Sequence, residues 1–387
     1  MKALVVGAGC CGASAARRLA ELGWEVTVVE RRSHIGGNAY DRRDRSGLLY
    51  HVYGPHLFFT DREPVWQFVE PFAEWTPFRC SLRVWIEGDS HPMPFQPETL
   101  RRLMPGQGDA ILQAMERQWP DRENVTVLEL LEADEPLLRL AGQRLYDCDC
   151  APYNRKQWEL RPEELSSEVI ARAPVWLKDQ KEFRPERFQF LPVQGFTEMF
   201  RTMLRHPSIR VLTGLDALSL FRIADGVIEW TGDQRWDAVL YTGSLDHLFE
   251  GQEGRLPYRT LRFQIQEAEA REGLPCLSMY YPEASFPWTR RTDYRHLPGN
   301  PPESEKTLLI GECPAAMAYP KDEPYYVVLT SRSKEQYCRY HRLAEKTAHL
   351  YIAGRLAEFR YYNMDDAVYR GIETAEALHQ KERGALL

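Results

Sequence analysis

Hydrophobic residues form two short runs within the first thirty positions, separated by a glycine-rich turn and a helical stretch. Residues 2–6 are apolar and rich in valine, the pattern of a strand that is buried on both faces. Residues 13–23 have the composition of a helix, and residues 25–29 form a second apolar strand that runs into Glu30. The order strand, turn, helix and strand predicts a nucleotide-binding unit of the Rossmann type.

Later hydrophobic patterns predict that further strands return to the same sheet. Residues 209–212 and 238–243 are short apolar runs, and residues 350–355 form a last strand that enters a glycine turn. Alternation of apolar and polar residues predicts hairpins and antiparallel strands between them. We expect a strand at 48–53, hairpins at 79–95 and 223–236, an extended segment at 183–196, antiparallel sheet over 256–328, and helices at 65–72, over most of 97–172, at 197–205 and at 364–380.

The turn of the first unit carries the spacing G-x-G-x-x-G, at Gly7, Gly9 and Gly12. The first glycine allows a tight turn, the second lets the backbone approach a pyrophosphate, and the third lets helix and strand pack closely. The N-terminus of the following helix offers N–H groups and the positive end of its dipole to the phosphates. Glu30 can accept hydrogen bonds from a ribose, which favours FAD or NAD over a 2′-phosphorylated cofactor.

The residues that follow Glu30 favour FAD over NAD. Residues 31–38, R-R-S-H-I-G-G-N, resemble the stretch that continues the fingerprint in FAD proteins of the glutathione-reductase type. Gly36 and Gly37 give the phosphates a second backbone approach, with Asn38 next to them, and Arg31 supplies positive charge. We therefore expect a bound FAD.

Together these patterns predict an α/β protein with a discontinuous Rossmann-type FAD-binding domain, an inserted helical lobe and an antiparallel β-sheet lobe. The strands of the FAD-binding layer are separated by long stretches of different character, so the lobes are insertions into that layer. The expected boundaries are 1–78, 209–255 and 346–387 for the three FAD-binding parts, 79–96 for a hairpin of the sheet lobe, 97–172 for the helical substrate lobe, 173–208 for a sheet-lobe segment with a helix, and 256–345 for the antiparallel sheet lobe.

Composition narrows the class of protein. The chain has 387 residues, of which 43% are hydrophobic and 27% charged, enough for several subdomains around a large core. A net charge of −7 argues against a nucleic-acid partner. The absence of a leader pattern and of a long apolar run predicts a cytoplasmic protein without a membrane partner. The eight cysteines are expected to be free thiols, and Cys148 and Cys150 lack a second pair at zinc-ligand spacing, so we expect no metal.

Several stretches resemble one family, the bacterial UDP-galactopyranose mutases, in the same order and over nearly the whole chain. The first is the opening glycine unit. The others are residues 34–40 (HIGGNAY), 53–56 (YGPH), 153–158 (YNRKQW), 192–195 (PVQG), 258–261 (YRTL), 289–290 (TR), 322–326 (DEPYY) and 354–364 (GRLAEFRYYNM). The last stretch is long and specific.

The resemblance implies an isomerase that interconverts the pyranose and furanose forms of a nucleotide sugar, in a homodimer. In this family reduced FAD acts as a nucleophile through its N5 atom and attacks the anomeric carbon, so an electron donor must first reduce the flavin. The reaction has no net redox change. By position, the catalytic residues are His56, Arg290, Tyr326 and Tyr361.

The resemblance also implies binding residues on the cofactor and substrate sides. Arginine and tyrosine donors suit a diphosphate because charge appears on it as it leaves. The expected cofactor-binding residues are Gly7, Gly9, Gly12, Glu30, Arg31, Gly36, Gly37, Asn38, His56, Val211, Gly354, Arg355, Asn363 and Met364. The expected substrate-binding residues are Tyr153, Trp158, Trp176, Phe188, Arg259, Arg290, Tyr326 and Tyr361.

The departures from the family pattern gather on the substrate side. Trp176 stands after a Pro-Val pair where the family has a second diphosphate arginine, and Phe188 replaces a phosphate-holding tyrosine. The other departures are Phe190 for a glycine, Phe59 for a histidine, Cys80 for an asparagine and Asn363 for an aspartate. These changes predict a divergent member of the family whose substrate is not UDP-galactopyranose.

Three hypotheses remain open. The first is a mutase for another nucleotide sugar, or one that holds the diphosphate through other arginines; Arg155, Arg172, Arg184 and Arg187 lie near in sequence. The second is a flavin-dependent oxidoreductase whose substrate lacks a nucleotide diphosphate. The third is an FAD-binding protein without turnover.

Overall fold

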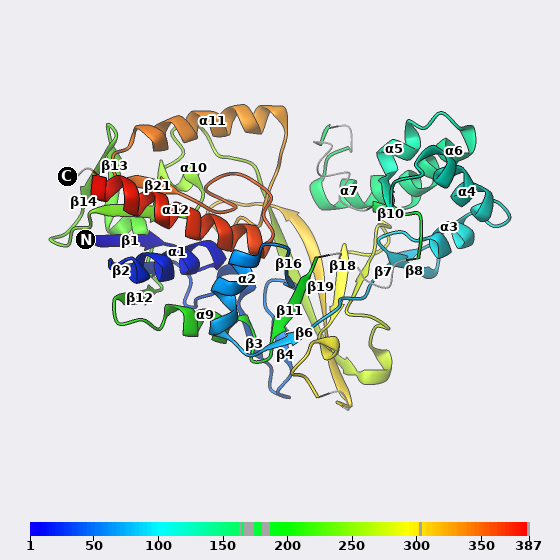
Figure 1. Cartoon of the computed structure of the whole chain (residues 1–387), viewed down its shortest axis with the longest axis horizontal. Helices are drawn as coiled ribbons and strands as arrows, with labels where there is room; N and C mark the ends of the chain where they lie inside the picture. Colours follow the sequence, from blue (N-terminus) through cyan, green and yellow to red (C-terminus); the bar gives the residue numbers. More distant parts are fainter. Residues whose placement is uncertain (162–163, 166–173, 180–185, 302–303, 385–387) are drawn as a thin grey trace. The chain divides into compact units, whose positions relative to one another are not determined.

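A computed structural model describes residues 1–161, 164–165, 174–179, 186–301 and 304–384. The chain divides into two compact units, each built from separate stretches of sequence. Unit 1 comprises Met1–Phe78, Glu186–Tyr258 and Met317–Leu387, and unit 2 comprises Arg79–Pro185 and Arg259–Ala316. Figure 1 shows both units coloured along the sequence.

Unit 1 is organised around a parallel sheet with the strand order β12-β2-β1-β15-β21. In chain order this is 3-2-1-4-5, the order of a Rossmann-type sheet, so the predicted fold class is confirmed. The central strand β1 is buried along most of its length because it pairs with β2 on one edge and with β15 on the other. The strands are β1 (Lys2–Val6), β2 (Glu25–Glu30), β12 (Ile209–Thr213), β15 (Ala238–Tyr241) and β21 (Leu350–Ile352).

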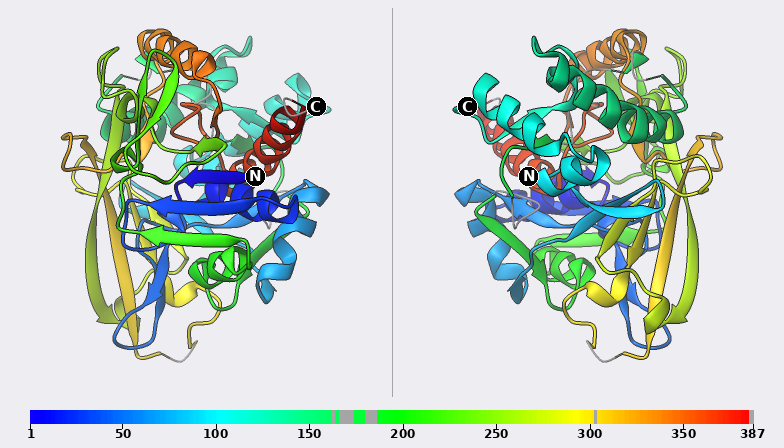
Figure 2. Two further views of the ribbon diagram at one scale, coloured as in Figure 1. Left: turned by 90° about the vertical axis from the view of Figure 1, so that its left-hand side faces the viewer. Right: turned by 90° about the vertical axis from the view of Figure 1, so that its right-hand side faces the viewer.

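Helices cover this sheet, and two of them pack closely. Helix α1 (Cys10–Glu21) lies along the C-terminal helix α12 (Met364–Gly384), and Figures 1 and 2 show them side by side. A Cβ atom at Gly371 would stand 2.3 Å from the carbonyl oxygen of Cys11, so glycine is what permits this approach. The other helices of the unit are α2 (Glu63–Val69), α9 (Phe196–Leu204), α10 (Leu245–Leu248) and α11 (Ser331–Lys346).

Short antiparallel strands complete unit 1. The sheet β5-β11-β6 and the hairpins β3-β4 and β13-β14 flank the parallel sheet. The buried Asp41 carboxylate on β3 accepts hydrogen bonds from the N–H groups of Phe196 and Thr197, which caps the N-terminus of α9. The strands are β3 (Asp41–Arg43), β4 (Leu49–His51), β5 (Phe58–Thr60), β6 (Trp75–Pro77), β11 (Phe188–Pro192), β13 (Phe221–Ala224), β14 (Val227–Trp230) and β20 (Tyr326–Val327).

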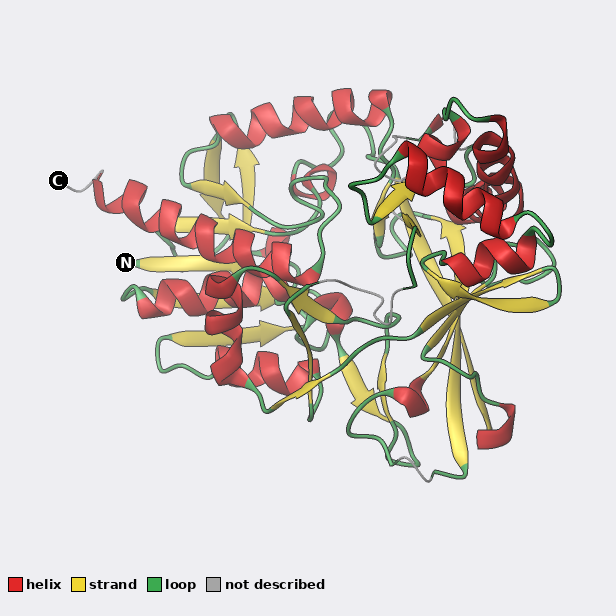
Figure 3. Cartoon of the chain, turned by 45° about the vertical axis from the view of Figure 1, so that its right-hand side comes forward, coloured by secondary structure: helices red, strands yellow, loops and turns green. Residues whose placement is uncertain are grey.

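Unit 2 contains a twisted sheet with the order β16-β19-β18-β17-β7-β8 (Figure 3). The pairing is antiparallel except between β17 and β7, which run parallel. The predicted hairpin is present as β7 and β8, which turn at Glu87 and Gly88, both with positive φ. The strands are β7 (Leu82–Ile86), β8 (Asp89–Met93), β16 (Tyr258–Glu269), β17 (Ser278–Tyr280), β18 (Arg290–Asp293) and β19 (Lys306–Ala316).

The helices of unit 2 pack around a core of apolar side chains that includes Phe95, Ile111, Leu130 and Leu145. Thr126 begins α5 with a capping box, because its hydroxyl accepts from the Glu129 N–H while the Glu129 carboxylate accepts from the Thr126 N–H. The elements are α3 (Pro97–Leu103), α4 (Gly108–Gln118), β9 (Asn124–Thr126), α5 (Val127–Leu131), α6 (Pro136–Leu145), the π-helical turn η3 (Tyr146–Cys150), α7 (Ala151–Trp158) and β10 (Pro174–Trp176).

The structure differs from the expected organisation in a few places. Helix α1 begins three residues earlier than expected, because Gly12 belongs to the helix rather than to the turn. Strand β9 interrupts the helical stretch 97–172 and pairs with β10, and residues 162–163 and 166–172 of that stretch lie outside the described residues. The boundaries of the sheet lobe also move: α9 packs on α1, and α11 contacts α10 and β21, so both helices belong to unit 1.

Candidate functional site

Two glycine loops face each other at the carboxyl end of β1. Gly7 has φ +101°, and a Cβ atom on Gly12 would stand 1.9 Å from the Gly7 carbonyl oxygen. A Cβ atom on Gly37, where φ is +56°, would stand 2.9 Å from the Cα atom of Gly9. Gly9 begins α1 without a side-chain cap, and the first turn carries no acidic residue. These loops therefore present backbone and a positive helix end, which fits an anionic pyrophosphate.

Glu30 closes the same end of the pocket with a buried carboxylate. It is 9% exposed, and its two oxygens accept hydrogen bonds from the N–H groups of Ala8 and Arg32, both at 2.9 Å. Each carboxylate oxygen retains a second lone pair, which can accept from a ribose hydroxyl. The residue thus ties the glycine turn to the end of β2 and lines the pocket together with Gly7 and Gly9.

We expect Glu30→Gln to weaken FAD binding about tenfold, because an amide NH₂ would replace one of the two accepting oxygens and oppose a backbone N–H. Equilibrium dialysis of the flavin from the purified protein measures the change. Glu25→Gln is the matched control, since Glu25 lies exposed at the start of the same strand. Equal flavin retention in both variants would contradict this role for Glu30.

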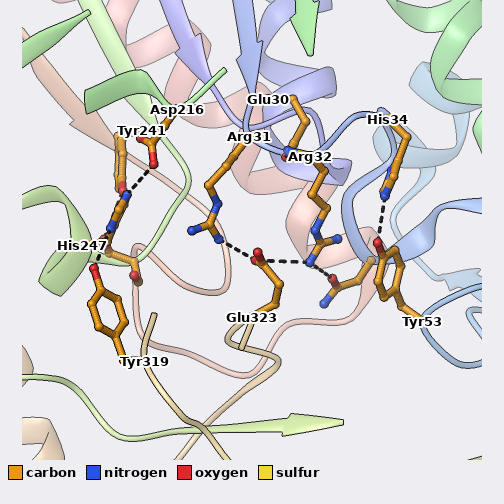
Figure 4. Close-up of polar contacts among 12 residues, drawn as sticks. Glu30, Arg31, Arg32, His34, Tyr53, Asp216, Tyr241, His247, Tyr319 and Glu323 are labelled. Carbon is orange, nitrogen blue, oxygen red and sulfur yellow. Dashed lines mark hydrogen bonds and ion pairs between the residues drawn. The ribbon is translucent and has the colours of Figure 1, made fainter. Parts of the chain in front are cut away.

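Opposite charges from distant stretches meet among the residues that line the pocket (Figure 4). Arg31 donates to the Glu323 carboxylate at 2.5 Å, and Arg32 lies 3.7 Å from the same carboxylate while donating to Asn38 Oδ1 at 2.9 Å. The guanidinium of Arg32 also lies over the Tyr53 ring, 4.4 Å from its centroid. The segment around Glu323 is thereby held against the residues that follow β2.

A second polar group lines the pocket on the side of β15 (Figure 4). The Asp216 carboxylate lies 3.1 Å from Nε2 of His247, whose other ring nitrogen lies 3.5 Å from the Tyr319 hydroxyl. The hydrogen bond from His247 lowers the pKa of Asp216. The Arg255 guanidinium lies over the Tyr319 ring, 3.7 Å from its centroid, and so holds this ring in place.

The predicted flavin-side residues line the pocket together. His56, Gly354, Arg355, Asn363 and Met364 are all among its lining residues. The ring of His56 lies 2.9 Å from the Gly54 carbonyl oxygen through Nδ1. Arg355 donates to the carbonyl oxygen of Tyr362, which holds the turn after β21 in place.

Tyr326 and Tyr361 stack on each other with ring centroids 5.7 Å apart and an interplanar angle of 11°. The Arg355 guanidinium lies 6.0 Å from the Tyr326 centroid and 5.9 Å from that of Tyr361. One cation and two phenol rings, predicted from two motifs that are distant in sequence, are therefore neighbours in unit 1. Such a group can hold an anion by charge and by hydroxyl donors.

In unit 2, a line of side chains runs from helix α7 to strand β18. The Tyr153 ring meets the Tyr280 ring edge-on at 6.0 Å, and Arg290 donates to the Tyr280 hydroxyl at 3.3 Å. Trp158, at the end of α7, is 5% exposed and packs in the interior. The unit thus brings Tyr153 and Arg290 into one cluster, although 137 positions separate them in sequence.

Both predicted arginines of unit 2 have carboxylate partners. Arg290 forms two parallel 2.8 Å bonds to the carboxylate of Glu312, which is 3% exposed. Arg259 is 3% exposed, donates to the Gln157 carbonyl oxygen at 3.0 Å and pairs with Glu159. Because Arg259 is buried at the end of α7, its contacts indicate a positioning role for the segment that carries Trp158.

Three predicted residues have surroundings that the sequence did not indicate. Phe188 stacks on Trp66, with centroids 5.3 Å apart, in an aromatic cluster of unit 1 that also contains Phe58, Trp75 and Phe190. Trp176 is 5% exposed, and its indole N–H has no hydrogen-bond partner among the described residues. Val211 pairs with Val28 within the parallel sheet and, in the described chain, is absent from the pocket lining.

The pocket as a whole fits FAD. Unpaired helix N–H groups face the phosphate position, Glu30 faces the ribose position, and the Asp216, His247 and Tyr319 group adds a further wall. Sequence reasoning missed the roles of Asp216, His247, Tyr319 and Glu323, because each lies far along the chain from the fingerprint and the first three belong to no motif. Only the acid-rich stretch at 322–323 carried a signal, as part of a family motif.

Two other kinds of feature are absent from the residues that the structure describes. Within those ranges, no helix combines the length and the apolar composition needed to cross a membrane. Likewise, the part of the chain that the structure describes contains no group of three or more histidine, cysteine, aspartate or glutamate side chains able to hold a metal ion.

Known proteins match this chain along its length. Residues 150–361 match the UDP-galactopyranose mutase family model, and residues 5–72 match an NAD(P)-binding Rossmann-like domain. The dTDP-fucopyranose mutase of Escherichia coli is 30% identical over 97% of either chain. The UDP-galactopyranose mutase of Mycoplasma pneumoniae is 29% identical over 97% of this chain and 96% of its own.

A solved structure agrees at the level of the fold. The crystal structure of reduced UDP-galactopyranose mutase has a TM-score of 0.73 at 19% identity and covers 98% of this chain and 94% of that chain. The family model spans more than half of the chain, and the Escherichia coli relative covers nearly all of it. The predicted resemblance and the FAD cofactor are confirmed, and the chain belongs to the UDP-galactopyranose mutase family of flavin-dependent nucleotide-sugar isomerases.

Proposed function

We propose that this mutase acts on a nucleotide sugar other than UDP-galactopyranose. The observation that carries the proposal is Trp176, which stands where the family pattern has a diphosphate arginine and is buried in β10. An indole offers a phosphate one neutral donor where a guanidinium offers two parallel charged donors. The match to a dTDP-fucopyranose mutase, at 30% identity, supports the view that members of this family differ in substrate.

When bound and reduced, FAD supplies a ring nitrogen as the nucleophile for the anomeric carbon, so the sugar can change ring form without net oxidation. The chain's own residues hold the reactants. We assign Arg355, with the stacked Tyr326 and Tyr361, to an anionic group of the substrate beside the flavin pocket. His56 lines that pocket and faces the flavin side.

We assign the nucleotide end of the substrate to unit 2. Tyr153 offers a ring for the base, and Arg290 offers a cation for the diphosphate, within one cluster. Glu312 neutralises part of the Arg290 charge, so Arg290 compensates the charge of a diphosphate less than an unpaired guanidinium would. Of the arginines considered as replacements for the missing one, Arg187 pairs with Glu63, Arg155 is exposed, and Arg172 and Arg184 lie outside the described residues.

The remaining parts of the proposal concern partners. An electron donor must reduce the flavin before turnover, and we propose that the protein works in the cytoplasm as a homodimer, with no nucleic-acid or membrane partner. The net charge of −7 supports the absence of a nucleic-acid partner.

We expect the purified enzyme to need reduction once and then to turn over many times. Limiting dithionite under anaerobic conditions should support at least about a hundred product molecules per electron pair, because an isomerisation consumes no reductant. Chromatographic product analysis against reductant consumed measures the ratio. One reductant consumed per product would support the oxidoreductase hypothesis instead.

The substrate assignment is tested by assaying UDP-galactopyranose beside other nucleotide hexoses under the same reducing conditions. We expect UDP-galactopyranose to have the lower kcat/KM. Efficient conversion of UDP-galactopyranose by the wild type would show that Trp176 and the other departures are neutral.

A further inference from the structure

Asp149 is a buried carboxyl for which the described residues provide no partner. It is 6% exposed, and within the described ranges no hydrogen bond or ion pair reaches it. Burial alone raises the pKa of this carboxyl to about 7. A buried polar group without a partner costs free energy, and in native proteins such groups are rare. The contacts of the described residues therefore do not account for this carboxyl.

The local backbone is irregular where it carries Asp149. The π-helical turn η3 ends at Cys150 and runs directly into α7, with Pro152 in the first turn of that helix. Proline has no N–H to donate, which accounts for the break in regular pairing. The Asn154 side chain donates to the Cys150 carbonyl oxygen at 2.8 Å and so supplies a replacement bond. Single π-turns of this kind occur frequently at functional sites.

Asp149 and Tyr153 lie four positions apart on this continuous helical run, so they share one face. From Tyr153 the cluster continues through Tyr280 to Arg290. The order along the cluster is a carboxyl, an aromatic ring and a cation. A nucleoside diphosphate carries the matching groups in the same order: a base edge with N–H donors, a base face that can stack on a ring, and a diphosphate.

We propose that Asp149 reads the base of the nucleotide sugar and selects guanine, so that the substrate class is a GDP-hexopyranose. The inference rests on the proposed function, which places the nucleotide end of the substrate at Tyr153. Guanine presents two neighbouring donors, N1–H and the N2 amino group, on one edge. Two parallel N–H donors match the two oxygens of a carboxylate, the geometry that makes paired charged hydrogen bonds strong.

The other bases do not satisfy this carboxylate. Uracil and thymine present a single N–H between two carbonyl oxygens, which repel the carboxylate oxygens on either side. Adenine and cytosine present one amino group beside a ring-nitrogen acceptor, so one carboxylate oxygen stays without a donor. A site built around a hydrogen bond rejects ligands that lack the matching group, because its buried polar atom is then unpaired.

The test begins with the wild-type holoenzyme and six probes: GDP, IDP, UDP, dTDP, ADP and CDP, titrated by isothermal calorimetry. We expect GDP to bind about 10- to 100-fold more tightly than UDP or dTDP. IDP lacks the N2 amino group, so its affinity should fall between those of GDP and UDP. UDP or dTDP binding at least as tightly as GDP would overturn the guanine assignment and leave the mutase proposal standing.

Two variants distinguish a role of Asp149 in recognising the base from a purely structural role. Asp149→Asn should lower GDP affinity at least about tenfold and remove the difference between GDP and IDP, since the amide has only one accepting oxygen. The control is Asp147→Asn, an exposed acid of the same turn that accepts from Gln143 Nε2 at 2.9 Å, which should leave both affinities unchanged. An unchanged GDP preference in a folded Asp149→Asn protein would also overturn the assignment.

Failure of the proposed function would appear differently. In that case none of the six nucleotides would bind the flavin-loaded enzyme, with or without Asp149. If Asp149→Asn does not fold, the wild-type ranking of GDP, IDP and UDP decides the matter alone.

Discussion

Replacing Gly9 with valine is expected to give a folded, colourless protein. Gly9 has φ −80° and ψ −171°, an extended conformation that any residue adopts, so the substitution introduces no backbone strain. A Cβ atom there would stand 3.6 Å from the Gly37 Cα atom, an ordinary contact. The added methyl groups enter the gap between the two glycine loops, which is the path of the pyrophosphate.

The size of the effect should be large because the phosphates lose several backbone hydrogen bonds together. We expect the FAD dissociation constant to rise at least about 100-fold, or ~2.7 kcal/mol. The ratio of flavin to protein absorbance after gel filtration measures occupancy, and urea unfolding of the apoprotein measures stability.

Two control variants show what the Gly9→Val result would mean for flavin binding and for stability. Gly232→Ala adds a side chain at an exposed bend with nothing within 4 Å, so it should change neither quantity. Gly12→Ala would place its Cβ 1.9 Å from the Gly7 carbonyl oxygen, so it should lower stability as well as flavin content. A Gly9→Val protein with full flavin occupancy would show that the pyrophosphate does not pass between the loops.

The FAD-binding layer could be predicted because its signals are local. A strand buried on both faces, a glycine turn and an acid at the next strand end are all contained within thirty residues. The short strands β9 and β10 could not be predicted, since each has only three residues and is too short to show the alternation of apolar and polar residues that marks a strand. Helix α9 was expected in the sheet lobe, because an amphipathic pattern shows that a helix buries one face and does not show which sheet it covers. Helix α11 (Ser331–Lys346) was not predicted, since residues 256–345 were assigned to that lobe as antiparallel sheet.

The candidate site also has one part that local motifs predict and another that depends on tertiary folding. The glycine loops, Glu30, Arg355 and Met364 follow from contiguous motifs, and the structure places them around one pocket. The Glu323 contact with Arg31 and the Asp216 contact with His247 depend on tertiary folding across long separations. Sequence also marked Phe188 as a lost phosphate contact, whereas its stacking on Trp66 supplies a packing reason for the aromatic ring.

Arg290, which the family pattern marks for the substrate, lies opposite Glu312 in the structure. The two residues are direct cross-strand partners on β18 and β19, joined by two 2.8 Å hydrogen bonds. Their side chains are 18% and 4% exposed. Arg290→Ala leaves the Glu312 carboxylate buried without its cation, and removal of one partner from a buried pair costs about 3–5 kcal/mol.

The same fold contains a matched control pair. Arg222 and Glu229 are also direct cross-strand partners, on β13 and β14, with a 2.7 Å bond, but their side chains are 75% and 45% exposed. Arg222→Ala should therefore cost only about 0–1 kcal/mol. Urea midpoints of both variants, compared with the wild type, measure the contrast, and equal losses would contradict the role of burial.

Catalysis by Arg290 can be separated from stability with a conservative change. Arg290→Lys keeps the positive charge beside Glu312 but replaces two parallel N–H donors with a single ammonium group. It should recover part of the stability lost in Arg290→Ala, whereas kcat/KM should stay at least about tenfold below the wild type because the paired geometry is absent. Flavin content should be unchanged in both variants, since the pocket-lining residues all belong to unit 1. If Arg290→Lys is fully active, the positive charge alone is sufficient, and Arg290 serves chiefly to hold Glu312.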